Sequence, residues 1–409
     1  MKLMAQPKPQ TPGPSRQGEH RPTSAADRAG PPPFMGALDA VIVDDRSEFQ
    51  FDGAVRKSEA AAVWAWLSRD VAPDLLGPMI AREPDAKTID AVAGEILGRA
   101  RAALAAAKDN ADAQRRLMVQ MGNSEMRDRL PVVLNALKCA PLFDKAKAFG
   151  RAVNGLADDD LVSALQSMPR QDAGIAGLLM MAALGQVINP ARLVVAATRI
   201  SGAATEDSLR RAGFLPLLEA DLAQAQNAIP PLLQSGAFVD VDMVCRAVER
   251  YHRLIRAITG SVELSRQTRI GPAIAALTKT VSEKLEPRLR DIPLHVNHSL
   301  RRMRENADRL DSDGLLAALN GIYLLAAVRD SRDSLALNEV FDDAWNRTGQ
   351  TLEMHLNRNM EALRANPTDA ILSARVDAGI KMAEVRFGTE YAEVLRRARE
   401  AIERRLASG

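Results

Sequence analysis

The sequence has few of the residues that usually carry chemistry or form cross-links. It holds two cysteines and five histidines in 409 residues, and only 4% of its residues are aromatic. Cys139 and Cys245 lie far apart in the chain and are typical of reduced thiols in a cytosolic protein rather than of a disulfide framework. With so few aromatic rings, the core must consist of Ala, Leu, Val, Ile and Met, which favours close helix packing.

An excess of charge of one sign is also missing. Lys and Arg number 54 against 52 Asp and Glu, so the formal net charge is +2 and no overall field favours nucleic acid or a membrane. The P-loop pattern GxxxxGK[ST], the hydrolase elbow GxSxG and the zincin pattern HExxH do not occur. Nucleotide hydrolysis, serine-hydrolase chemistry and zinc-protease chemistry therefore lose their usual support.

Apolar runs long enough to span a bilayer are lacking as well. The strongest candidate, from Ala173 to Ile188, is interrupted by Gln186, and at about 1.5 Å per residue it falls short of a hydrocarbon core of about 30 Å. We expect a helix buried on all sides there. The first ten residues lack the apolar stretch of a secretory signal, so a cytoplasmic location is expected.

What is present is a Pro-rich leader followed by helical patterns. Residues 1–36 have few apolar side chains and many prolines, which predicts a disordered tether, with a docking tail or a secretion address as alternatives. Residues 41–43 are strand-like and predict a short strand, a hairpin or an extended arm. Beyond Asp52 the apolar residues recur every three or four positions, and Pro, Gly and capping residues separate the runs. This pattern predicts an all-α fold.

Two helical regions are predicted, because helix signals fade between Pro230 and Gly236. Residues 37–235 are expected to form the first region, which begins with the strand-like entry segment. Residues 236–409 carry longer helices with Arg and Glu on their outer faces and predict a C-terminal helical bundle.

Within the first region, helical patterns begin roughly thirty residues apart, at Asp128, Asp158 and Pro190. Second helices are expected between them, at residues 142–153 and 173–188. Helix pairs at a regular spacing bury their apolar faces against their neighbours, which favours a solenoid-like array. The side chains themselves repeat poorly, so an irregular bundle stays open as the alternative.

One acidic motif is similar to that of a known enzyme family. Asp342, Asp343 and Asn346 form a DDxxN pattern that resembles the aspartate-rich motif of class I terpenoid synthases, whose carboxylates bind magnesium and thereby a diphosphate. A second set follows at four-residue spacing: Asp369, Ser373 and Asp377. The resemblance implies a magnesium-dependent helical enzyme. The two sets are too close in sequence to occupy opposite walls of a deep cavity, so solvated carboxylates and a helix N-cap are the leading interpretation.

Histidines offer a second candidate metal site. His295 and His298 lie three residues apart and can share one helical face, with His252 or His355 as a third ligand. The surrounding stretch is rich in arginine, which disfavours a divalent cation. We therefore expect ordinary surface or partly buried histidines, and neither a metal nor a cofactor.

Arginines are the remaining candidates, as contacts to an anion or a protein partner: Arg301, Arg302, Arg304, Arg396 and Arg397. The leading prediction is a non-catalytic, bacterial-type cytoplasmic protein, a scaffold or regulator that binds a protein partner through its helical faces. The alternatives are the magnesium-dependent enzyme and a binder of nucleic acid or anionic membrane surfaces through the Arg-rich helices.

Overall fold

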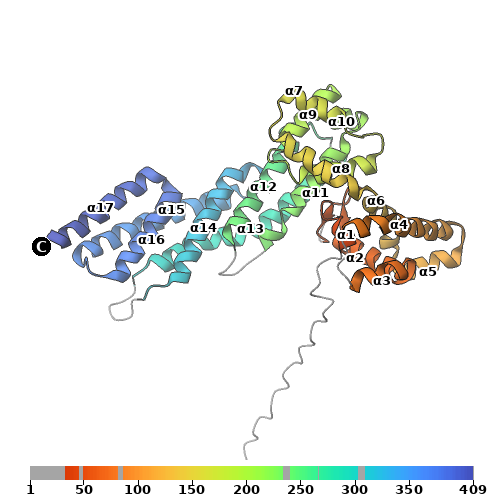
Figure 1. The fold of residues 1–409 in the computed structure, drawn as a ribbon. Coiled ribbons are helices and arrows are strands. Elements are labelled where there is room, and N and C mark those ends of the chain that lie inside the picture. The colour runs from red at the N-terminus through yellow and green to blue at the C-terminus, as the bar shows by residue number, and fades with distance from the viewer. Residues whose placement is uncertain are drawn as a thin grey trace, which may run out of the picture.

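The computed structural model describes residues 33–45, 49–81, 86–233, 240–265, 267–302 and 309–408. Within these ranges the chain forms seventeen α-helices and two strands of two residues each (Figure 1). The prediction of an all-α helical array is confirmed. The predicted disorder of the leader concerns residues outside the described ranges, up to residue 32. Residues 33–36, assigned to the end of that leader, form the short helix α1, in which Phe34 and Met35 are buried.

A small N-terminal unit precedes the main array. Its elements are α1 (Pro33–Gly36), β1 (Ile42–Val43), β2 (Val55–Arg56), α2 (Lys57–Trp66), a π-helix (Leu67–Val71), α3 (Pro73–Ala81), α4 (Ala86–Asp109) and α5 (Ala111–Met121). The two strands pair in parallel, so the strand-like residues 41–43 do not begin a hairpin. The buried carboxylate of Glu59 on α2 accepts from the Arg56 amide at 2.9 Å and from Arg129 Nε at 3.0 Å, which fixes α2 to the helix α6 (Ser124–Val153).

The remaining helices pack in two rows. The first row contains α6 (Ser124–Val153), α8 (Ala173–Leu184), α11 (Leu215–Asn227), α13 (Ile270–Leu300) and α15 (Asn338–Ala365). The second row contains α7 (Asp158–Gln166), α9 (Ala191–Ser201), α12 (Val241–Thr259), α14 (Ser312–Ser331) and α16 (Ala370–Phe387). Each helix packs on the next one in its row, and α17 (Thr389–Ser408) ends the array against α16. The short α10 (Glu206–Arg211) packs on α9 and α11. Figure 1 shows the rows extending from the N-terminal unit to the C-terminus.

The helix α6 corrects the predicted pairing. The sequence indicated separate helices from Asp128 and over residues 142–153, but α6 runs through both with Pro131 and Pro141 inside it. Buried Leu137 and Phe143 lie on either side of Pro141 and belong to the same core. The helix α6 continues through Pro141 although proline cannot donate a backbone hydrogen bond. Apolar packing on both sides of the proline holds the helix together there.

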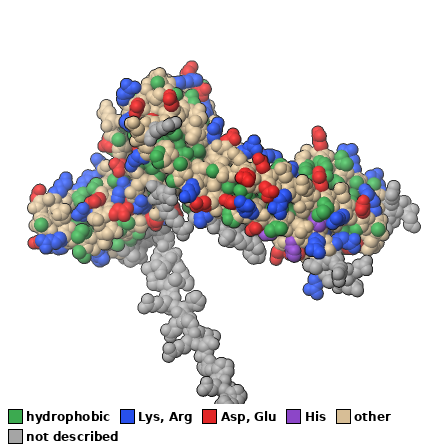
Figure 2. Space-filling model, turned by 180° about the vertical axis from the view of Figure 1, so that it is seen from behind, with side chains coloured by type: hydrophobic (Ala, Val, Ile, Leu, Met, Phe, Trp, Pro, Cys, Tyr) green, Lys and Arg blue, Asp and Glu red, His purple; other side chains and the backbone are tan. Residues whose placement is uncertain are grey.

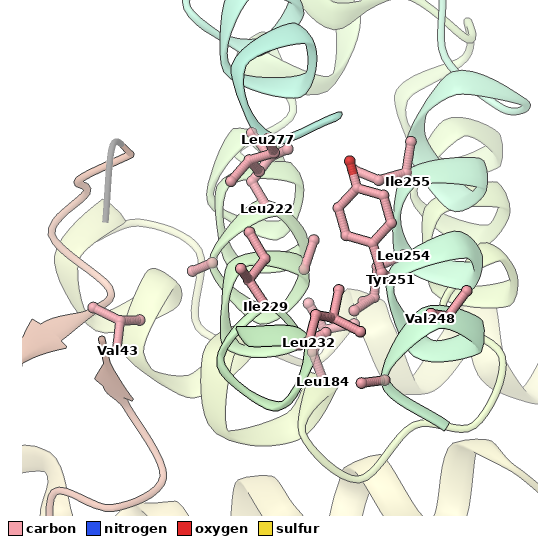
Figure 3. Packing of buried hydrophobic residues seen from close by; sticks show 14 of the residues in the cluster. Val43, Leu184, Leu222, Ile229, Leu232, Val248, Tyr251, Leu254, Ile255 and Leu277 are labelled. Atoms are coloured by element: carbon pink, nitrogen blue, oxygen red, sulfur yellow. The ribbon is translucent and has the colours of Figure 1, made fainter. Parts of the chain in front are cut away.

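Packing is continuous across the break near residue 235. Leu222 and Ile229 of the α11 segment lie close to Tyr251 and Ile255 of α12 in one buried cluster (Figure 3). Leu232, in the 3₁₀ turn Pro230–Leu233, belongs to the same cluster. The boundary at residue 235 stays a prediction, but helices from its two sides share one core.

The apolar stretch near Ala173 forms part of that core. From Ala176 to Leu184 every residue of α8 is buried, as expected for a helix covered on all sides. Among the described residues, no helix has the length and apolar character needed to cross a membrane.

Candidate partner-binding surface

The acidic motif lies on the surface of α15 and does not converge with the second acidic set. Asp342 and Asp343 are exposed and pair with Arg332 and Arg347, at 3.9 and 3.2 Å. Asn346 is exposed as well. In the second set, Asp369 caps α16 by accepting from the Leu372 amide, while Ser373 and Asp377 both accept from Arg399 of α17. Each set therefore has local partners of its own, and the geometry gives no support to a shared diphosphate site.

The histidine pair also lacks the partners of a metal site. His295 and His298 are exposed near the end of α13. His252 accepts from or donates to Ser334 Oγ at 3.0 Å, and His355 is buried beside Asn297. In the described ranges, no three His, Cys, Asp or Glu side chains are grouped so that they can hold a metal ion.

A polar cavity of about 430 Å³ lies beside α10, but its charged groups satisfy one another. The buried Glu206 carboxylate accepts from Arg210 at 2.8 Å and from Thr268 Oγ1 at 2.7 Å. Glu219 pairs with Arg269 at 2.7 Å. Because these ions are already paired, the cavity presents little unsatisfied charge to a ligand.

The five arginines singled out by the sequence have different environments. Arg396 pairs with Glu384 and Glu393, which raises the pKa of Arg396 and ties α17 to α16. Arg397 is exposed on α17. Arg304 lies outside the described residues. Arg301 and Arg302 directly follow α13, are exposed, and form no ion pair with any described residue.

Buried polar contacts hold the end of α13 against α15. His355 Nε2 lies 2.8 Å from Asn297 Oδ1, and Asn359 Nδ2 donates to the Leu300 carbonyl at 3.0 Å. Moving from Asn297 to Leu300 along α13 corresponds to moving from His355 to Asn359 along α15, so the two helices run parallel here. The second contact holds the backbone of Leu300, next to Arg301, against the side chain of Asn359, next to Arg358.

These contacts bring together a surface that we name the α13–α15 face: Leu294, His298, Arg301, Met354 and Arg358. Leu294 is 56% exposed and Met354 is 38% exposed, although both are large apolar side chains. In Figure 2, histidine side chains lie beside Lys and Arg side chains on the C-terminal half of the molecule. The end of the face that holds Leu294 and Met354 is thus apolar, and the end nearer the helix C-termini is basic.

The basic groups of this region lie near the imidazole of His355. Burial lowers the pKa of His355, and the charges of Arg358, Arg301 and Arg375 lower it further. Arg375 of α16 is buried and donates to the Arg309 carbonyl at 3.3 Å. Three arginines from three different elements therefore surround one imidazole.

Sequence reasoning found Arg301 and Arg302 but missed Arg358, Leu294 and Met354. Met354 and Arg358 are four residues apart, a spacing that places them on one helical face. That spacing is common on surface helices, and it indicates a binding surface only once the register of α13 against α15 is known.

No protein family, curated protein or solved structure matches the chain.

Proposed function

We propose that this protein is a non-catalytic, cytoplasmic scaffold or regulatory protein that binds a protein partner through the outer faces of its helical rows. The observation that carries the proposal is the α13–α15 face, where exposed apolar side chains adjoin arginines on two helices held in fixed register. Arginine and large apolar side chains dominate the energetics of protein interfaces. The two stacked rows support the same role, because such arrays present extended surfaces to partners.

A reducing compartment agrees with the state of the two thiols. Cys139 and Cys245 are not bonded to each other, and burial raises the pKa of both, that of Cys245 to about 11. Thiols of this kind are protonated at neutral pH and react slowly.

The proposal is tested by isolating the partner and rebuilding the complex. The full chain, immobilised through a C-terminal tag, is incubated with extract of its source cells, and retained proteins are identified by mass spectrometry. A retained protein is then purified and titrated into the chain by calorimetry. We expect a saturable complex of defined stoichiometry. If nuclease-treated extract yields no protein that binds in the purified system, the proposal is wrong.

Binding of nucleic acid or of an anionic membrane remains the second candidate, because Arg301, Arg302 and Arg358 can equally contact phosphates. The two candidates differ in the part played by Leu294 and Met354. Binding to a phosphate backbone depends on salt and little on these apolar side chains, whereas a protein interface needs both.

A further inference from the structure

Some arginines of α13 and α15 pair with acids, whereas those of the α13–α15 face form no ion pair with a described residue. Arg290 of α13 pairs with Glu286 at 2.7 Å, and Arg347 of α15 pairs with Asp343 at 3.2 Å. Further along the same two helices, Arg301 and Arg358 are exposed and have no ion pair among the described residues. Within the described ranges, the charges of Arg301 and Arg358 thus have no acidic partner.

Helix electrostatics account for only part of this arrangement. Cations at a helix C-terminus interact favourably with the helix dipole, which explains Arg301 just after α13. Arg358 lies well before Ala365, where α15 ends, so it is outside the last turn. Glu361, one turn beyond Arg358, is exposed and forms no ion pair with it. The helix dipole therefore does not explain the position of Arg358 near Arg301.

Arg301 and Arg358 carry like charges, which repel one another unless an anion compensates them. Burial, and then the charges of Arg358 and Arg301, lower the pKa of the neighbouring His355. The backbone next to Arg301 is nevertheless held in place, because the Leu300 carbonyl accepts a hydrogen bond from the side chain of Asn359, the neighbour of Arg358 on α15. A rigid basic group next to exposed Leu294 and Met354 is complementary to a segment that carries both carboxylates and apolar side chains.

We propose that the α13–α15 face docks an acidic, leucine-bearing helical segment of a partner protein, with Leu294 and Met354 contacting its apolar side chains and Arg301 and Arg358 pairing with its carboxylates. Arginine suits this role because its planar guanidinium pairs with a carboxylate through two parallel hydrogen bonds. This inference rests on the proposed function, since it names the chemistry of the partner and the site that receives it.

The test uses a fluorescein-labelled peptide of Glu and Leu in a helical pattern, titrated into the full chain and followed by anisotropy. Three comparison ligands separate the contributions: a Glu and Ser peptide, a single-stranded RNA, and vesicles containing phosphatidylserine. We expect the Glu and Leu peptide to bind the most tightly of the four, and its binding to weaken as salt is raised.

Two variants and one control locate the site. Reversing the charges with Arg301→Glu and Arg358→Glu is expected to weaken peptide binding by about tenfold or more. Removing the apolar contacts with Leu294→Ser and Met354→Ser is expected to weaken it while the arginines stay in place. Arg101→Glu with Arg151→Glu changes the net charge equally at exposed positions elsewhere, which form no ion pair with a described residue, and is expected to leave binding unchanged. Circular dichroism verifies that each variant is folded.

The inference is overturned if the control weakens binding as much as the charge-reversal pair. It is also overturned if RNA, vesicles or the Glu and Ser peptide bind as tightly as the Glu and Leu peptide. If an isolated protein partner binds both α13–α15 variants as well as the unchanged chain, the docking site is wrong while the proposed function stands.

Discussion

Arg250 of α12 and Arg192 of α9 cap the C-termini of two neighbouring helices of the first row in the same way. Each is a second-row side chain that donates to backbone carbonyls at the C-terminus of a first-row helix, whose last carbonyls have no partner within the helix. Arg192 donates to the carbonyls of Val153, the last residue of α6, and of Leu156 just after it; Arg250 donates to those of Leu184, the last residue of α8, and of Val187 just after it. These contacts connect the two rows by hydrogen bonds as well as by apolar packing.

Replacing Arg250 by methionine is expected to destabilise the protein. The Arg250 side chain is partly buried and burial lowers its pKa, so the guanidinium is stabilised by its hydrogen bonds to the Leu184 and Val187 carbonyls. We expect Arg250→Met to lower the free energy of unfolding by about 2–4 kcal/mol in urea titrations. Arg253→Met is the control, because the Arg253 side chain is 41% exposed and lies 3.8 Å from Glu249 in a weak ion pair. Its effect should stay below about 0.5 kcal/mol, and equal losses in the two variants would contradict a capping role for Arg250.

The carboxyl of Asp221 provides a test by pH. Asp221 is fully buried on α11, neither of its oxygens has a hydrogen-bond partner among the described residues, and burial raises its pKa well above the usual value despite the opposing charge of Arg250. In the unfolded chain the same carboxyl ionises near pH 4. Above that pH the folded state therefore holds more protons, and the stability of the unchanged protein falls as pH rises toward the folded-state pKa.

Asp221→Asn removes this titration while keeping the shape of the side chain. We expect the variant to be more stable than the unchanged protein at pH 7 and the advantage to shrink as the pH falls below about 4, where the carboxyl becomes neutral in the folded and in the unfolded protein. Each unit of pKa shift corresponds to about 1.4 kcal/mol. Thermal unfolding over this pH range measures the difference. A variant that is less stable at pH 7 would mean that Asp221 is ionised and stabilised by Arg250.

Two glycines form a matched pair for testing the packing of α6 on α8. A Cβ atom at Gly150 of α6 would overlap the Ala183 carbonyl oxygen of α8, whereas a Cβ at Gly98 of α4 has no neighbour within 4 Å. Gly150→Ala must push the two helices apart and is expected to cost about 1–3 kcal/mol or more. Gly98→Ala is expected to stabilise the protein by about 0.5–1 kcal/mol, because alanine favours the helix over glycine. Urea titration distinguishes the two, and a neutral Gly150→Ala would show that α6 and α8 are not closely packed.

The helices were readable from the sequence, but their partners were not. Capping residues such as Asp172 and Asp240 bind the first amides of α8 and α12, which is local chemistry that the sequence carries directly. Pro141 misled the prediction because the packing that retains it inside α6 comes from distant residues. Arg358 was missed for the same reason: its position beside Arg301 depends on the register of two helices joined by Asn359 and Leu300.

Arg386 stacks on Trp345 and thereby joins α16 to α15, and this contact gives the final prediction. The guanidinium of Arg386 on α16 lies 3.8 Å from the centre of the Trp345 ring on α15, and Arg386 donates to the Trp345 carbonyl through Nε at 3.2 Å and Nη2 at 3.1 Å. Burial lowers the pKa of Arg386, so its charge depends on these contacts. Arg329 stacks on the same ring at 5.3 Å but is about half exposed and pairs with Asp330.

We expect Arg386→Ala to lower the free energy of unfolding by about 2–3 kcal/mol and Arg329→Ala by about 0.5 kcal/mol or less, since cation–π contacts are stronger when the cation is desolvated. Arg386→Lys should recover little, because an ammonium cannot stack on the ring and donate two hydrogen bonds to one carbonyl. Hydrogen exchange gives the spatial readout: amides of α15 and α16 should exchange faster in Arg386→Ala, while those of α6 and α8 should not change, because the helix rows pass stability mainly between neighbours. Uniformly faster exchange along the whole chain would instead mean that the array unfolds as one cooperative unit.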